Sequence, residues 1–259
     1  SSEGLMLTNH HCAYGYIQDH SSIENDYIKN GFWAMKKTEE LPNEGLSASF
    51  LISIEEVTDS IALELNDKMS ESERNKKIKE LSKKIIDYKS TEEGYNHQIK
   101  SFYGGNKFYL LTYETFKDVR LVGAPPSSIG KFGGDTDNWM WPRHTGDFAL
   151  YRVYCGPDGK PAEFSKDNMP YKPKHHLPIQ LDGVENNDFT MIFGYPGSTD
   201  RYLTSYGIKN ALDIKNPTIV DIRNKKLAII KAGMDSDQKT KIQYAAKYAR
   251  TANYWKYYI

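Results

Sequence analysis

Short apolar runs, each followed by residues that favour turns, dominate the first part of the chain. Leu5–Thr8 is one of these runs, and it has the length of a short buried strand. Similar runs predict strands at residues 50–54, 107–114, 115–122, 148–154 and 189–193. The stretch between the first two runs contains turn dipeptides such as Asn30-Gly31, and it predicts a loop-rich region.

One charged segment inside this β-rich region has the period of a helix. Ser70 and Glu73 form the pattern of a capping box, in which each side chain bonds the backbone of the other. Ile78, Leu81 and Ile85 then recur at spacings that place them on one helical face. We therefore predict an amphipathic helix within about residues 70–90, packed on the sheet with a structural role.

The pattern becomes helical after about Ser205. Asn216 and Pro217 predict the N-cap and the first position of a helix, and Gly233 predicts its C-terminal end. A second helix is predicted from near Ser236, and one of its faces is formed by Ile242, Ala246, Ala249 and Asn253.

Several short strands separated by turns favour an antiparallel barrel or sandwich. The sequence thus predicts a mainly β protein with an α-helical insert. The change of period places a boundary near residue 200. We expect residues 1–200 to form a β-barrel domain and residues 201–259 to begin an α-helical domain.

Composition and charge exclude several classes of function. The 34 basic residues equal the 34 acidic ones, so the chain has no electrostatic footprint for non-specific nucleic-acid binding. No apolar run approaches the ~20 residues that a membrane span needs. No C-x-x-C or H-E-x-x-H spacing supports a metal site, although four residues can be imagined as zinc ligands: His10, Cys12, His144 and Cys155. We expect no cofactor.

A pair of histidines follows the first predicted strand, in the sequence Thr8-Asn9-His10-His11-Cys12. Histidine suits proton transfer because its pKa lies near neutral pH. This segment resembles the catalytic-histidine segment of chymotrypsin-like peptidases, and by position the resemblance makes His11 the general base. The alternatives are a metal-binding pair or an exposed pair without a role.

An aspartate opens a later strand in the sequence Thr145-Gly146-Asp147-Phe148-Ala149. This segment resembles the catalytic-aspartate segment of the same class, in which the carboxylate accepts the imidazole N–H and fixes its tautomer. The chain order, histidine before aspartate, is the chymotrypsin order. We therefore predict that Asp147 and His11 lie within hydrogen-bonding reach. If they do not, His10 with Asp135 or Asp137 is the next pair to consider.

Longer stretches around both motifs are more specific. Residues 4–15 and 133–147 closely resemble the bacterial dipeptidyl peptidase 7 and 11 family, whose members remove dipeptides from peptide amino termini; residues 194–199 and 252–256 resemble it too. The resemblance implies a chymotrypsin-like fold, with this chain covering the first of two barrels and the start of a helical domain. It also implies that Asn138, Trp139 and Asn253 bind the free amino group of the substrate. Ala13 departs from the family, in which glycine is more usual.

The nucleophilic serine cannot be assigned to this chain. No G-x-S-G segment occurs, and Ser198 follows Gly197 in what is predicted to be a turn. The resemblance implies that the serine, the oxyanion hole and the specificity pocket lie in a second barrel. Both ends of the chain look cut, so we expect a fragment that is inactive by itself. The alternatives for Cys12 and Cys155 are a disulfide with each other, pairing with residues outside this piece, or free thiols. For Cys12, beside the predicted base, we expect a disulfide with an upstream cysteine.

The leading hypothesis is a serine dipeptidyl aminopeptidase that acts by acyl transfer. The alternatives are a chymotrypsin-fold endopeptidase of the protease-chaperone kind and an inactive module that holds peptide amino termini. The expected partners are peptides with a free amino terminus, and a second copy in a homodimer. From the resemblance we expect a periplasmic, cell-surface or secreted bacterial protein.

Overall fold

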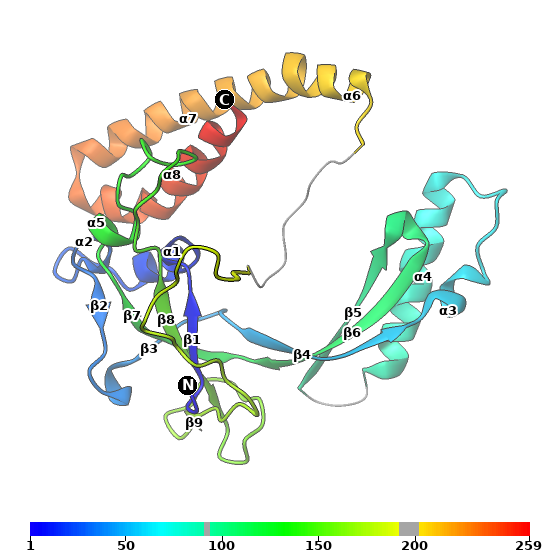
Figure 1. Cartoon of the computed structure of the whole chain (residues 1–259), viewed down its shortest axis with the longest axis horizontal. Coiled ribbons are helices and arrows are strands. Elements are labelled where there is room, and N and C mark those ends of the chain that lie inside the picture. The colour runs from blue at the N-terminus through cyan, green and yellow to red at the C-terminus, as the bar shows by residue number, and fades with distance from the viewer. Residues whose placement is uncertain (91–93, 192–201) are drawn as a thin grey trace.

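The computed structural model describes residues 1–90, 94–191 and 202–259, in which antiparallel strands form two sheets (Figure 1). Helix α1 (His10–Asp19) packs on the first sheet, near α2 (Tyr27–Asn30). The order in this sheet is β1-β8-β7-β2, and two further short strands pair with β7 and β8. The bounds are β1 (Leu5–Thr8), β2 (Phe32–Trp33), β3 (Leu41–Pro42), β7 (Asp118–Ala124), β8 (Ala149–Cys155) and β9 (Met169–Pro170).

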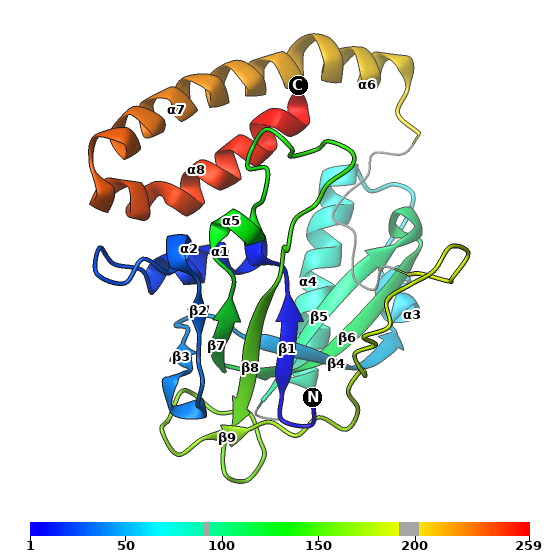
Figure 2. The same cartoon turned by 60° about the vertical axis from the view of Figure 1, so that its left-hand side comes forward.

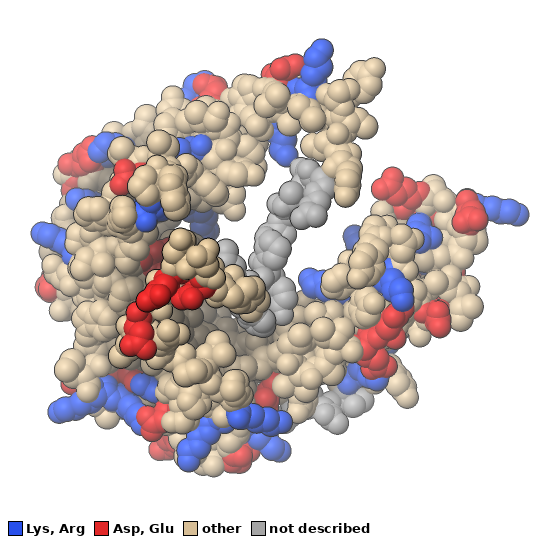
Figure 3. All heavy atoms as spheres, viewed as in Figure 1, with Lys and Arg blue, Asp and Glu red and all other residues tan. Residues whose placement is uncertain are grey.

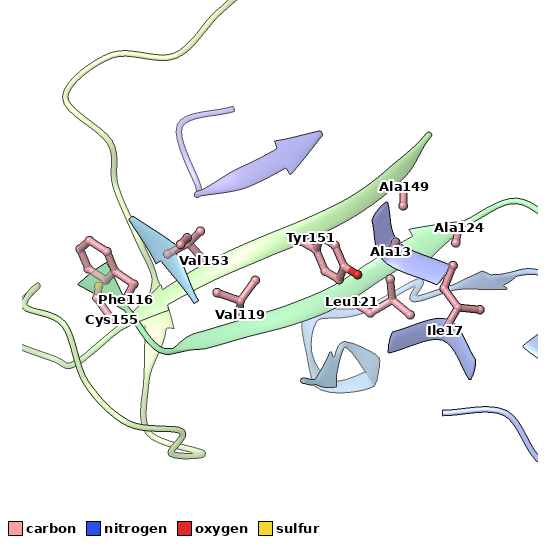
Figure 4. Close-up of a cluster of buried hydrophobic side chains, with 11 residues drawn as sticks. Ala13, Ile17, Phe116, Val119, Leu121, Ala124, Ala149, Tyr151, Val153 and Cys155 are labelled. Atoms are coloured by element: carbon pink, nitrogen blue, oxygen red, sulfur yellow. The ribbon is translucent and has the colours of Figure 1, made fainter. Parts of the chain in front are cut away.

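Buried apolar side chains from β7, β8 and α1 form the core of this first part (Figure 4). Ala13 and Ile17 of α1 are fully buried there, against Leu121 of β7 and Ala149 of β8. Close packing between α1 and the sheet fixes the helix that begins at His10, and with it the position of the adjacent His11.

The second sheet has the order β4-β6-β5, formed by β4 (Ala48–Glu56), β5 (Tyr95–Phe102) and β6 (Lys107–Phe116). Helices α3 (Thr58–Ala62) and α4 (Glu71–Lys89) supply Ile61 and Leu81 to its core, beside Phe108. A short 3₁₀ helix, Tyr103–Gly105, connects β5 to β6, and another, Lys37–Glu39, connects β2 to β3 of the first sheet.

The end of the chain is a pair of long helices. Helix α6 (Ser205–Asn210) continues through a π-helical turn, Ala211–Lys215, into α7 (Asn216–Ser236), and α8 (Gln238–Tyr258) returns antiparallel to it (Figure 2). Helix α8 lies against α1, where Gln18 Oε1 accepts the Ala246 backbone N–H at 2.7 Å. This contact anchors the helical pair on the same helix that carries His11.

Most of the predicted elements are confirmed. The capping box exists, since Ser70 Oγ accepts the Glu73 N–H at 3.3 Å and Glu73 Oε2 accepts the Ser70 N–H at 2.9 Å. Helix α4 therefore begins where the sequence predicts, and α8 begins within two residues of the predicted position. The strands predicted at 50–54, 107–122 and 148–154 are present as β4, β6, β7 and β8.

Other local predictions are wrong. The stretch after β1, predicted to be loop-rich, begins with the ten-residue helix α1, which the sequence pattern did not predict. Asn216 is not an N-cap, because its φ of −67° and ψ of −48° are helical and the helix runs through it from α6. Gly233 lies inside α7 rather than at its end. No strand is present at residues 189–191, and residues 192 and 193 lie outside the described part.

The antiparallel β fold with a helical excursion and a helical end is confirmed. In the described residues the two sheets are open at their edges and are not closed into a barrel. The predicted boundary near residue 200, like Ser198 and the segment 194–199, lies outside the described residues, so the division into residues 1–200 and 201–259 stays a prediction. None of the described helices is long and apolar enough to span a bilayer.

Candidate active site

Strand pairing brings His11 and Asp147 together. In the antiparallel register of β1 and β8, Thr8 lies opposite Ala149. His11 comes three residues after Thr8, in the first turn of α1, and Asp147 comes two residues before Ala149. The end of β1 and the start of β8 lie side by side, so the two side chains are at the same end of the sheet although they are 136 positions apart in sequence.

The Asp147 carboxylate binds both the ring and the backbone of His11. His11 Nδ1 lies 2.6 Å from Asp147 Oδ2, and the His11 backbone N–H donates to Asp147 Oδ1 at 3.0 Å. Asn9 Nδ2 donates to the Asp147 backbone carbonyl at 3.2 Å. The predicted hydrogen-bonding reach is confirmed. When Nδ1–H donates to the carboxylate, the Nε2 lone pair of the neutral ring is free to accept a proton.

These hydrogen bonds also shift both pKa values. The bond to Asp147 raises the pKa of His11 above its usual value and outweighs partial burial, which lowers it. Partial burial raises the pKa of Asp147, but the bonds from the ring and the backbone of His11 outweigh it and leave that pKa below its usual value. The pair is thus set to hold a charged imidazolium beside a carboxylate. The His11 side chain is 72% exposed, so its ring is accessible to other groups.

His10 has a different environment. It is 1% exposed, its ring packs edge-on to Tyr14, and its Nε2 has no partner within the described residues. Burial lowers the pKa of His10, which favours its neutral form. Asp135, the alternative acid, bonds Lys131 instead at 2.7 Å. His10 therefore packs as a core residue, and the geometry favours His11 as the base.

The three residues predicted for amino-group binding also meet. Asn138 Nδ2 donates to Asn253 Oδ1 at 2.9 Å, and Trp139 Nε1 donates to the Asn253 backbone carbonyl at 3.2 Å. Asn138 is 9% exposed, whereas Trp139 is 57% exposed and leaves much of its ring surface open. The loop between α5 (Ser127–Gly130) and β8 therefore carries Asn138 against α8 and Asp147 against α1.

The profile of the peptidase S46 family matches residues 1–259. This chain belongs to the peptidase S46 family. It is 52% identical over 256 residues to an Asp/Glu-specific dipeptidyl-peptidase of Capnocytophaga gingivalis, and 48% identical over 256 residues to dipeptidyl-peptidase 7 of Porphyromonas gingivalis. Each match covers 99% of this chain but 36% of the relative, so the S46 chain spans little more than a third of their length.

Solved structures agree with the sequence matches. The crystal structure of Porphyromonas endodontalis DPP11 in complex with the dipeptide Arg-Asp gives a TM-score of 0.93 at 43% identity. That match covers 100% of the S46 chain and 38% of the DPP11 chain. The resemblance to dipeptidyl peptidases 7 and 11 is confirmed, and so is the assignment of the chain to the amino-terminal part of such a fold.

Sequence reasoning missed three residues of the candidate site. Arg143 donates to Asn138 Oδ1 at 3.0 Å and thereby orients the amide. Lys256 Nζ donates to loop carbonyls, and the Tyr257 ring packs on Trp139 with centroids 5.1 Å apart. The available signal was spacing, because Lys256 and Tyr257 follow Asn253 by three and four positions and share its helical face.

Metal and disulfide chemistry find no geometric support at this site. Within the described ranges, no three side chains of His, Cys, Asp or Glu gather as metal ligands would. Cys12 is exposed and Cys155 is buried, and the two are not bonded to each other. The proposed pairing of Cys12 with an upstream cysteine stays a prediction.

Proposed function

We propose that this S46 chain supplies the general base, its orienting carboxylate and the amino-terminus site of a serine dipeptidyl peptidase with a trypsin-like fold. One observation carries the proposal. A single loop, residues 131–147, brings Asp147 to His11 at one end and Asn138 to Asn253 in its middle. Proton-transfer chemistry and recognition of a free amino group thus share one element, as an enzyme that cuts at a fixed distance from the amino terminus requires.

The proposed reaction is acyl transfer. A serine hydroxyl, which we place outside this chain because the relatives are almost three times as long, attacks the peptide carbonyl. His11 Nε2 takes the hydroxyl proton and returns it to the leaving amine. Asp147 holds the His11 tautomer and stabilises the imidazolium that forms between these steps. Water then releases the dipeptide from the acyl-enzyme by the same proton transfers.

In the proposed amino-terminus site, side-chain carbonyl oxygens accept hydrogen bonds from the substrate ammonium. Asn138 Oδ1 accepts one bond from Arg143 and keeps a second lone pair, and Asn253 Oδ1 likewise accepts one bond from Asn138. The exposed face of Trp139 offers a π surface to the cation. An amino-blocked peptide has no such charge and should bind poorly, because the buried acceptors would lose a partner.

Two wider properties are also proposed. We infer from the family resemblance that the complete protein is a homodimer and that it acts in the periplasm, at the cell surface or outside a bacterial cell. Sedimentation of the complete gene product tests the first property. Fractionation of the source cells, with a periplasmic marker as the control, tests the second.

The test of the proposed function is an assay of the complete gene product on three reporters: a dipeptide with a free amino terminus, its acetylated form, and a reporter cut internally. We expect the free dipeptidyl reporter to be turned over far faster than its acetylated form, with no cleavage of the internal reporter. Turnover of both dipeptidyl reporters should be lost in the variant His11→Ala. Cleavage of the internal reporter would instead indicate an endopeptidase. Binding of free-amino peptides without turnover would indicate an inactive recognition module.

A further inference from the structure

Three residues in the last turns of α8 contact the 131–147 loop. Asn253 bonds Asn138 and Trp139, Lys256 bonds the backbone just before them, and Tyr257 packs on the Trp139 ring. Figures 1 and 2 both show the loop after α5 lying against α8. The three helix residues are spaced by three and four positions, so they form one face that is directed at the loop.

Lys256 is a cation bound by backbone oxygens. Its ammonium donates to the Asp135 carbonyl at 2.7 Å and to the Thr136 carbonyl at 2.6 Å. In the part of the chain that the structure describes, no carboxylate lies within ion-pair distance of Lys256, and the Asp135 carboxylate bonds Lys131 instead. The partly buried charge therefore fixes a backbone rather than neutralising an acid, and bonds from a charged donor are among the stronger ones.

The backbone that Lys256 holds leads directly into the amino-terminus site. Thr136 precedes Asn138 by two residues, and Trp139 follows with a φ of +60°, a conformation that costs free energy for a residue with a side chain. Such a conformation persists only where surrounding contacts enforce it. The Lys256 bonds on one side and the Asn253 and Tyr257 contacts on the other enforce it here.

We propose that Lys256 is a positioning residue that sets the Asn138 amide for the substrate amino group. This inference rests on the proposed function, and it adds a residue that does not itself touch substrate. Without Lys256 the 135–136 backbone loses both of its bonds to α8, and the loop can leave the conformation that places Asn138 on Asn253. Selection of free-amino peptides should then weaken, whereas the His11–Asp147 pair, held by β1 and β8, should not change.

The test uses the complete gene product with Lys256→Met and a matched control, Lys241→Met, which removes an exposed lysine of the same helix. For Lys256→Met we expect kcat/KM on the free dipeptidyl reporter to fall about tenfold or more, mainly through KM. The pH at which the rate is half-maximal should stay at the wild-type value. Hydrogen exchange of the 131–140 amides should accelerate. Lys241→Met should match the wild type in all three measurements.

Two further variants distinguish loss of the Lys256 hydrogen bonds from misfolding of the protein. Lys256→Arg keeps the charge and can donate to both carbonyls, so it should recover most of the lost selectivity. Lys256→Gln can also donate two bonds but is neutral, so it should recover less. Unchanged KM and unchanged exchange in Lys256→Met would overturn the inference, and so would a loss in kcat with a shifted pH profile. If the wild type releases no dipeptide, the proposed function fails. The exchange measurement then still decides whether Lys256 holds the loop.

Discussion

The Asp147 carboxylate divides its two oxygens between the ring and the backbone of His11. A ring fixed in this way cannot rotate without breaking a charge-assisted bond, so its Nε2 stays directed to one side. Asn9 secures the aspartate from the strand end, which makes the pair rigid before any substrate binds.

The raised pKa of His11 predicts the acid limb of the pH–rate profile. A general base must be unprotonated, so kcat/KM should rise with pH through a value above the ordinary one of about 6.5. Asp147→Asn removes the largest cause of the shift. The limb should therefore move to lower pH, while the rate falls at every pH. Measuring kcat/KM across pH for both proteins checks this, and NMR titration of His11 gives an independent value. An unmoved limb would contradict the pairing.

Residue motifs predicted that His11 and Asp147 would pair, because both follow local patterns at strand ends. They did not predict Arg143, Lys256 or Tyr257 as parts of the site. The Lys256 contacts span 121 and 120 positions, and no local pattern encodes which loop a helix face will meet. Resemblance alone supplied Asn138 and Asn253, whose contact the structure shows at 2.9 Å.

At the scale of elements, local signals predicted α4 well and α1 poorly. The capping box of α4 needs four consecutive residues, which the sequence displays directly. Helix α1 has the polar sequence HHCAYGYIQD, and Ala13 and Ile17 are its fully buried apolar residues. Its stability comes from packing on the sheet and on α8, which the sequence pattern does not display.

The contact between α1 and α5 predicts a large difference between two glycine substitutions. In Gly130→Ala the new Cβ would lie 2.4 Å from the His10 ring, so the buried ring must shift. We expect a loss of about 1–3 kcal/mol in the free energy of unfolding. Gly15→Ala in α1 meets no atom within 4 Å and should stabilise the helix by about 0.5–1 kcal/mol.

Chemical denaturation of the two glycine variants beside the wild type measures both effects. Equal stability of Gly130→Ala and the wild type would show that His10 does not pack beneath α5. Destabilisation by Gly15→Ala would contradict the open environment of that helix face.

At the scale of the molecule, the described surface is hollowed between the α7–α8 hairpin and the lobe of β4–β6 and α4 (Figure 3). Charged side chains of both signs are interspersed over the face drawn in Figure 3, in keeping with a net charge of zero. Large apolar side chains are exposed on several elements, including Leu212 in the π-helical turn and Ile222 on α7. Strand spans were predictable, but the open sheets were not, because pairing depends on contacts distant in sequence.

We expect the 259-residue chain by itself to show no peptidase activity. Among the described residues no hydroxyl is hydrogen-bonded to His11, so the base has no nucleophile to activate. Exposed apolar surface should also make the isolated chain prone to self-association. The purified chain is assayed on the free dipeptidyl reporter, with His11→Ala as the control for contamination. Turnover that His11→Ala abolishes would show that the nucleophile lies within these residues, and Ser198 would be examined first.

The most direct test of the whole account is the ratio of kcat/KM on the free reporter to kcat/KM on its acetylated form. It is measured in the complete gene product for the wild type, Asn138→Ala and Asp147→Asn. Asn138→Ala should lower the ratio by about 100-fold, because it removes one of the two carbonyl acceptors of a substrate ammonium that is taken out of water. Asp147→Asn should slow both reactions and preserve the ratio. A ratio that Asn138→Ala leaves unchanged would contradict the assignment of this loop to amino-terminus recognition.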